Sequence, residues 1–203
     1  MPNFRDQLEQ YLRREASPAH KYSHQPRLYA LTKQIAALTP SLSYDDDIVF
    51  AAAFLHDLGV FVGHRPEDPE ALKQWNHVPY TCERAPQILA DINFPTAKIS
   101  AVLACIRKHQ PHDDPQTIEA TILRDADILE QLGAIGALRA LVKVGRDTRY
   151  RSYSDVIPVL EKAARELPAK LRTDAGRKLA EPRIAALQAL LASIAQEAGK
   201  LLH

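Results

Sequence analysis

Apolar residues recur at helical spacing along almost the whole chain, and this pattern constrains the fold more than any other feature. Leu28, Leu31 and Ile35 lie on one face of a predicted helix that stops at Pro40. Similar spacing predicts further helices over residues 46–58, 75–92, 95–109, 118–132, 154–167 and 173–203. No segment alternates convincingly between apolar and polar residues, as a half-buried strand would. The sequence therefore predicts an all-α fold.

Polar or turn-forming segments separate these helices. Residues 64–73 are predicted to form a loop, and residues 110–116 are a connection rich in Pro and Asp. The helix that starts near Ile118 is predicted to end within residues 133–136, which contain two glycines. Residues 143–153 combine Arg and Tyr and are predicted to form an exposed loop. That loop either is solvated or closes over an anionic substrate.

Composition and charge exclude several classes of protein. The 203 residues fit one domain, alone or with an appendage. A net charge of +1 gives no whole-protein argument for binding nucleic acid or an anionic membrane. The seven glycines form neither a P-loop nor a dinucleotide-binding motif. Nucleic acid is therefore not an expected partner.

The cysteines and the N-terminus indicate where the protein is located. Two cysteines make no disulfide framework, which favours a reducing compartment. The first residues carry charge where a signal peptide needs an apolar stretch. No apolar run approaches the roughly 20 residues needed to span a bilayer. We therefore expect a soluble, cytoplasmic protein without a membrane partner.

The pair His56–Asp57 lies within a run of Ala, Phe and Leu, residues 51–58. Burying an imidazole and a carboxylate there is costly unless a metal or hydrogen bonds satisfy both groups. A second pair, His112–Asp113, has no apolar flank and is expected to be solvated. The apolar setting of the first pair, rather than the dipeptide itself, therefore predicts a site for a divalent cation.

Further residues that can bind a metal belong to other predicted helices or to their ends, namely His24, His77, His109 and Asp127. His109 lies on the apolar face that also carries Val102 and Ile106. Helical bundles build metal sites from such inward-facing side chains of different helices. Taken singly, each histidine is also explained as a helix cap, and Asp127 as the partner of an arginine such as Arg139.

This order of residues resembles the HD superfamily of metal-dependent phosphohydrolases, whose motif runs H…HD…D on separate helices. The sequence HKYSHQPR at residues 20–27 is similar to the family's HDxxHxxRV opening, and AAFLHDLG at 52–59 is similar to AALLHDIG. Residues 119–139 resemble the EAxIxxDADRLDAxGAxGxxR segment of a bacterial branch, and residues 171–183 resemble its TxxGRxxAxxR segment. The resemblance therefore extends over most of the chain.

The resemblance implies a single-domain, HD-type helical bundle with additional C-terminal helices. Residues 1–140 would form the metal-binding core, and residues 141–203 would add the exposed loop and the helices that pack on the same domain. The resemblance implies four metal ligands, His24, His56, Asp57 and Asp127. It also implies that His77 and His109 bind substrate phosphate or a second metal.

The chain departs from the family pattern at several positions. Pro26 precedes Arg27 and is expected to bend or restart that helix. Ile128 and Glu130 stand where the family has Arg and Asp, which changes the contacts expected around the ligands. Val60 replaces the lysine that often follows the HDIG motif.

Two imidazoles and two carboxylates suit Mn²⁺, Fe²⁺, Co²⁺, Ni²⁺ or Zn²⁺, and Mg²⁺ stays an option. Such a cation activates water and a phosphoryl oxygen. We therefore expect hydrolysis of a phosphate ester or anhydride in a nucleotide or a related small phosphorylated metabolite. Residues predicted to bind this substrate or to support the ligands are His20, Arg27, Lys108, Asp125 and Arg139. His20 would share a face with His24 if that segment is helical. A homodimer is kept open as the oligomeric state.

Two other functions stay open. The candidate ligands suffice for a dinuclear-iron oxygenase in which Asp57 bridges two irons, and metal analysis separates this reading from a hydrolase with one cation. Alternatively, the metal stabilises a ligand-binding protein without enzymatic activity. Structural metal sites close their coordination sphere, whereas the predicted ligand set leaves room for water.

Overall fold

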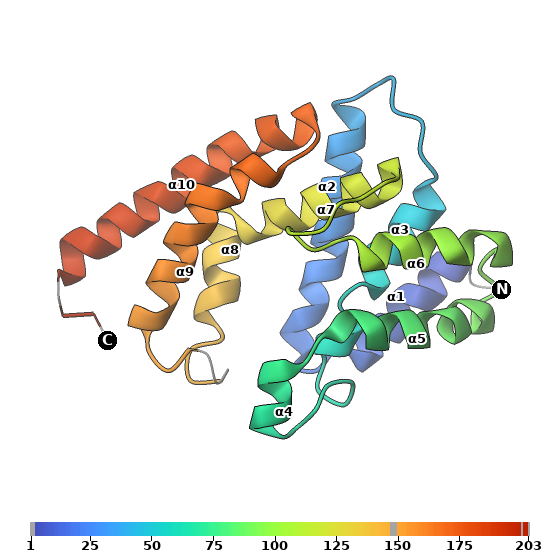
Figure 1. Ribbon diagram of the computed structural model, residues 1–203, viewed down its shortest axis with the longest axis horizontal. Helices are drawn as coiled ribbons and strands as arrows, with labels where there is room; N and C mark the ends of the chain where they lie inside the picture. The colour runs from blue at the N-terminus through green and yellow to red at the C-terminus, as the bar shows by residue number, and fades with distance from the viewer. Residues whose placement is uncertain (1–2, 147–149, 200, 203) are drawn as a thin grey trace. The chain divides into compact units, whose positions relative to one another are not determined.

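The computed structural model describes residues 3–146, 150–199 and 201–202. Within these ranges the regular secondary structure is entirely helical, which confirms the predicted all-α fold (Figure 1). The chain divides into two compact units, residues 1–124 and 125–203, and the boundary falls inside one helix. Part of the predicted loop 143–153, residues 147–149, lies outside the described residues.

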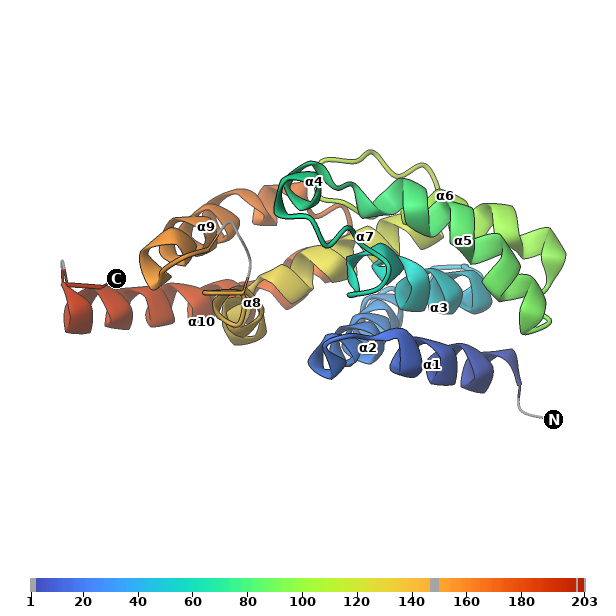
Figure 2. The ribbon, with the colours of Figure 1, turned by 90° about the horizontal axis from the view of Figure 1, so that it is seen from below.

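The first unit consists of α1 (Phe4–Glu15), α2 (His24–Ala37), α3 (Asp46–Leu55), α4 (Pro69–Gln74), α5 (His77–Asp91), α6 (Ile99–Arg107) and the first part of α7 (Ile118–Gln131). Three short 3₁₀ helices belong to the same unit, namely η1 (Ala19–Ser23), η2 (Leu58–Val60) and η3 (Thr96–Lys98). Helix α3 packs against α1, α2 and α6, and α5 lies beside α6 (Figures 1 and 2).

Helix α3 is the centre of the first unit. Each of its residues from Ile48 to Leu55 is buried. A helix that is apolar on every side can be stable only when it is surrounded by other elements. Phe50 and Phe54 stack at 4.5 Å between ring centroids within this core. The apolar run therefore places its C-terminal end, which continues into the His-Asp pair, deep inside the unit.

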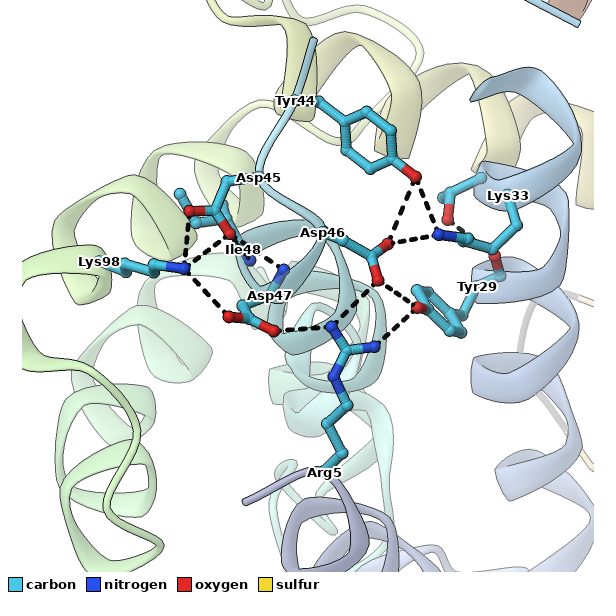
Figure 3. Close-up of polar contacts among 10 residues, drawn as sticks. Arg5, Tyr29, Lys33, Tyr44, Asp45, Asp46, Asp47, Ile48 and Lys98 are labelled. Carbon is cyan, nitrogen blue, oxygen red and sulfur yellow. Dashed lines mark hydrogen bonds and ion pairs between the residues drawn. The ribbon is translucent and has the colours of Figure 1, made fainter. Parts of the chain in front are cut away.

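Charged side chains hold the N-terminus of α3 (Figure 3). The Asp45 carboxylate caps the helix by accepting hydrogen bonds from its first backbone N–H groups. Arg5 of α1 binds Asp46 and Asp47, at 3.0 and 2.7 Å. Lys98 of η3 binds Asp45 and Asp47, at 2.7 and 3.0 Å. These ion pairs tie the start of α3 to two neighbouring elements and so fix where its other end lies.

The second unit contains the rest of α7, α8 (Gly133–Leu141), α9 (Tyr153–Glu166), η4 (Pro168–Lys170) and α10 (Asp174–Ala198). Helix α10 packs against α8 and α9, and α8 packs against α9. The chain turns between α7 and α8 at Gly133, whose φ of +76° is readily adopted by glycine.

Three helices correct the expectations from sequence. Helix α1 was not predicted, and α4 (Pro69–Gln74) begins within residues 64–73, which were predicted to be a loop. Residues 133–136, predicted to end a helix, instead begin α8. At α4, Asp68 caps the helix and Pro69 occupies its first turn, so short-range signals suffice without an apolar stripe.

The predicted division of the chain into residues 1–140 and 141–203 stays a prediction. No described helix combines the length and apolar character needed to cross a membrane.

Candidate metal centre

His56 lies directly after α3, at its C-terminal cap, and is fully buried. Its Nδ1 atom lies 2.9 Å from the backbone oxygen of Ala53. Because a carbonyl oxygen can only accept a hydrogen bond, Nδ1 carries the proton and donates it. The lone pair is then left on Nε2, which is the arrangement that metal-binding imidazoles use. The end of α3 thus presents a nitrogen prepared to bind a cation.

His24, His56 and Asp57 converge and are called here the first ligand group. The Nε2 atoms of His24 and His56 lie 3.2 Å apart. The Oδ2 atom of Asp57 lies 3.8 Å from His24 Nε2 and 3.5 Å from His56 Nε2. His24 is the first residue of α2, and Pro26 lies in the first turn of that helix. The expectation that Pro26 restarts the helix therefore agrees with the structure.

Asp57, His77 and His109 form a second ligand group, which shares its carboxylate with the first. The Oδ1 atom of Asp57 lies 3.2 Å from His77 Nε2. His109 is buried, and its Nδ1 lies 2.7 Å from the backbone oxygen of Ile106, so its Nε2 also keeps the lone pair. The ring centroids of His56 and His109 are 4.9 Å apart. The structure thus brings four of the predicted histidines, His24, His56, His77 and His109, together around the Asp57 carboxylate.

The spacing of the donor atoms fits a divalent transition metal. Two ligands with metal bonds of about 2.1 Å lie roughly 3.0 Å apart at a right angle and roughly 3.4 Å apart at a tetrahedral angle. The separation of 3.2 Å between the Nε2 atoms of His24 and His56 falls between these values. Imidazole and carboxylate donors together suit Mn²⁺, Fe²⁺, Co²⁺, Ni²⁺ or Zn²⁺. The residues present therefore fit such a cation, and they leave its identity open.

The electrostatics of Asp57 favour a negative charge at the centre of the cluster. Burial by itself would raise the pKa of Asp57, but the charge interaction with His56, when its ring is protonated, and the interaction with His77 hold this pKa well below its usual range. Asp57 is therefore ionised at neutral pH. A half-buried carboxylate in contact with several imidazoles is suited to bind a cation.

The 3₁₀ helix η2, which follows the His-Asp pair, is fastened by hydrogen bonds to Trp75 and to α5, and these bonds were not predicted from the sequence. The indole Nε1 of Trp75 donates to the backbone oxygen of Gly59 at 2.8 Å. The Gly59 N–H donates to the buried hydroxyl of Thr81 at 3.2 Å. These bonds hold Asp57 and His77 near one another. Thr81 follows His77 by one helical turn, but nothing in the local pattern identifies its partner in a different segment.

Asp127, the fourth predicted ligand, belongs to the second unit and lies on α7. It is buried, at 8 % exposed, and its Oδ2 atom accepts a hydrogen bond from Gln131 at 3.1 Å. From the sequence, Arg139 was considered as an alternative partner of Asp127. In the structure, Nη1 of Arg139 lies 3.5 Å from Oε2 of Glu130. The place of Asp127 in the ligand set stays a prediction.

The residues predicted to support the site have different environments. His20 is exposed in the 3₁₀ helix η1, so the α-helical spacing to His24 does not apply. Lys108 is exposed, and Arg27 is half-buried. Asp125 is fully buried, and its carboxylate accepts hydrogen bonds from the backbone N–H of Arg172 and from the N–H and hydroxyl of Thr173. Asp125 therefore anchors the loop before α10.

The second His-Asp pair behaves only partly as expected. The His112 side chain is 76 % exposed, in agreement with a solvated residue. Asp113 is instead mostly buried, and its Oδ2 accepts a hydrogen bond from the Gln110 N–H at 3.0 Å. The short carboxylate caps a turn here, as Asp often does.

The HD domain family model matches residues 22–132, which is more than half of the 203 residues. The matched region includes both ligand groups and Asp127. Among curated proteins, none matches the chain in sequence.

Solved structures with the same fold include several bacterial proteins. YpgQ of Bacillus subtilis, solved in complex with ADP, is 22 % identical, with a TM-score of 0.72, over 98 % of this chain and 96 % of YpgQ. A predicted HD superfamily hydrolase from an uncultured Thermotogales bacterium is 23 % identical, with a TM-score of 0.64, over 96 % of this chain and 92 % of its own. An HD-superfamily hydrolase from Bacillus thuringiensis is 17 % identical, with a TM-score of 0.67, over 97 % of both chains.

Proposed function

We propose that this chain, which belongs to the HD domain family, is a metal-dependent phosphohydrolase. The observation that carries the proposal is the first ligand group. His24, His56 and Asp57 place two imidazole nitrogens and a carboxylate oxygen within 4.8 Å of one another. The bond from His56 Nδ1 to Ala53 fixes the tautomer that a cation requires.

A divalent cation held by these residues supplies Lewis acidity toward a phosphoryl oxygen and toward water. Asp57 contributes both carboxylate oxygens, Oδ2 toward the first ligand group and Oδ1 toward His77. The Nε2 atom of His77 lies 3.2 Å from Oδ1 of Asp57, and when this nitrogen carries a proton the charge attraction between the two groups orients the carboxylate. His77 then acts by holding Asp57 in place, as well as by its own charge.

The position of the proton on the His109 ring limits the chemical roles that this residue can have. Its Nδ1–H is donated to Ile106, so the neutral ring offers only an acceptor at Nε2. An acceptor binds a cation or takes a proton from water, whereas contact with a phosphate oxygen requires the protonated ring. His109 is therefore better suited as a base or a ligand than as a neutral phosphate contact.

A small phosphorylated metabolite, and a nucleotide in particular, is the proposed substrate class. The complex of YpgQ with ADP supports this choice, because the two proteins share a fold over nearly their whole lengths. Among the predicted phosphate-binding cations, Arg27 and Lys108 are at least partly accessible to solvent. Guanidinium and ammonium groups pair well with phosphate oxygens.

The second ligand group favours one alternative, a dinuclear centre. Because Asp57 belongs to both groups, Asp57, His77 and His109 would hold a second cation beside the one held by His24, His56 and Asp57. With two irons, the same arrangement would serve an oxygenase. Metal analysis separates the two functions, since two irons with oxygen-dependent activity favour the oxygenase, and phosphate release without oxygen favours the hydrolase.

The proposal is tested by removing the metal, restoring single divalent cations and screening nucleotides for phosphate or pyrophosphate release. Asp57→Asn keeps the size of the side chain and removes its charge, and we expect it to lower the release at least 100-fold. His112→Gln, in the solvated His-Asp pair, is the matched control and should retain the wild-type rate. If no nucleotide is hydrolysed with any cation, or if Asp57→Asn is fully active, the proposal is wrong.

A further inference from the structure

Arg124 is a buried arginine of the first unit that the proposed chemistry does not use. The whole residue is only 3 % exposed. Its guanidinium donates from Nη2 to the backbone oxygen of Pro111 at 2.7 Å, and from Nε to that of Gln110 at 3.3 Å. Arg124 therefore reaches from α7 to the segment that follows His109.

Packing alone does not account for an arginine at this position. Its neighbours Ile122 and Leu123 are apolar and fully buried. Burying a guanidinium costs several kcal/mol unless its N–H groups are satisfied. An apolar side chain would fill space on α7 without this cost. The hydrogen bonds to Gln110 and Pro111 are interactions that an apolar side chain could not make.

These bonds matter because His109 lies outside a helix. Helix α6 ends at Arg107, so helical geometry does not determine where the His109 ring lies. On one side the ring is held by the oxygen of Ile106. On the other side the Gln110 N–H donates to the Asp113 carboxylate, and the Gln110 oxygen accepts from the Asp113 N–H at 2.9 Å and from Arg124 at 3.3 Å. The backbone of Gln110, which follows His109, is thus held at both its N–H group and its carbonyl oxygen.

We propose that Arg124 is a positioning residue that holds His109 in the second ligand group. This inference rests on the proposed metal centre. Residues that orient metal ligands typically change metal affinity about 10- to 100-fold when they are substituted. We therefore expect Arg124→Gln to weaken Mn²⁺ binding about 10-fold. Arg124→Lys keeps a positive donor that reaches one carbonyl, and it should restore part of the affinity.

A double-mutant cycle distinguishes positioning from a general loss of stability. Mn²⁺ binding is measured by calorimetry, well below the unfolding temperature, on the full chain and on Arg124→Gln, His109→Ala and the double variant. If Arg124 acts through His109, Arg124→Gln has no further effect once His109 is absent. Arg177→Gln is the matched control, because the Arg177 guanidinium also donates to a backbone carbonyl at 2.7 Å, that of Leu171 in the second unit. The control should bind Mn²⁺ as the wild type does.

Each outcome decides the inference. Unchanged affinity in Arg124→Gln overturns it, and so does an equal loss in the presence and absence of His109. If Arg124→Gln does not fold, Arg124→Lys takes its place in the cycle. A wild-type chain that binds Mn²⁺ but hydrolyses no nucleotide refutes the proposed function only, and the affinities still decide the role of Arg124. A wild-type chain that binds no Mn²⁺ overturns this inference.

Discussion

Replacing Gly59 by alanine should push His77 away from Asp57. A Cβ atom on Gly59 would lie 3.0 Å from both the Cβ and the backbone oxygen of His77, and 3.1 Å from Cδ1 of Tyr80. Ordinary contacts of this kind begin at 3.4 Å. The nearest atoms belong to the backbone or are bonded to it, so a side-chain rotation cannot relieve the overlap. The start of α5 must move instead.

The free-energy change follows from two opposing effects. Overpacking typically costs about 1–3 kcal/mol. Restricting the unfolded chain by a Gly→Ala change returns about 0.4–1 kcal/mol. The net loss therefore lies between about 0 and 2.6 kcal/mol, with a midpoint of about 1.3 kcal/mol. For a chain of this size the melting temperature falls by about 2–4 °C per kcal/mol, so at the midpoint we expect a decrease of about 3–5 °C.

The assay combines thermal unfolding with Mn²⁺ calorimetry, and Gly63→Ala is the control. Gly63 has a φ of +92°, and a Cβ there would meet nothing within 4 Å. Its substitution costs about 1 kcal/mol through the backbone alone and should leave Mn²⁺ affinity unchanged. Gly59→Ala should lower both stability and affinity. The reasoning is refuted if Gly59→Ala binds Mn²⁺ like the wild type, or if Gly63→Ala weakens binding equally.

Two further predictions concern stability. Asp125→Asn should lower the free energy of unfolding by about 2 kcal/mol, because the buried carboxylate accepts several hydrogen bonds, including two from Thr173. Urea unfolding measures this difference, with Asp174→Asn, a substitution of an exposed aspartate, as the control. Equal stabilities of the two variants would contradict the prediction. The hydrogen bond from Arg5 lowers the pKa of Asp47, so the stabilising contribution of Asp47 is complete above its unfolded pKa of about 3.9 and is lost as the pH falls through the lower folded value. The difference in unfolding free energy between the wild type and Arg5→Met should therefore shrink below about pH 4, and a difference independent of pH would show that Arg5 acts by packing alone.

The helices that were predicted correctly are those whose own apolar residues indicate that the helix is buried. Residues 46–55 contain a continuous apolar run preceded by Asp45, and α3 begins and is buried accordingly. The same segment carries the HD motif, so the family was recognisable from sequence and is confirmed by the match over residues 22–132.

The missed helices lack such local evidence. Helix α1 buries only Leu8 and Leu12 completely, so its apolar stripe is narrow. Helix α8 follows Gly133, and a glycine after a helix usually indicates its end. Here the glycine turns the chain, and a new helix starts at once because α8 packs against α9 and α10.

The sequence by itself determined which residues are candidate metal ligands and in what order they occur, since burying imidazoles and a carboxylate among apolar residues is costly unless a cation or hydrogen bonds satisfy them. Only the tertiary structure decided that Asp57 is shared by two groups of histidines, and that Arg124 supports the segment after His109. His24, His77 and His109 are separated from Asp57 by many residues, and their distances depend on how whole helices pack. Local spacing determines which face of a helix a residue occupies, whereas the contacts of that face are fixed by packing between segments distant in sequence.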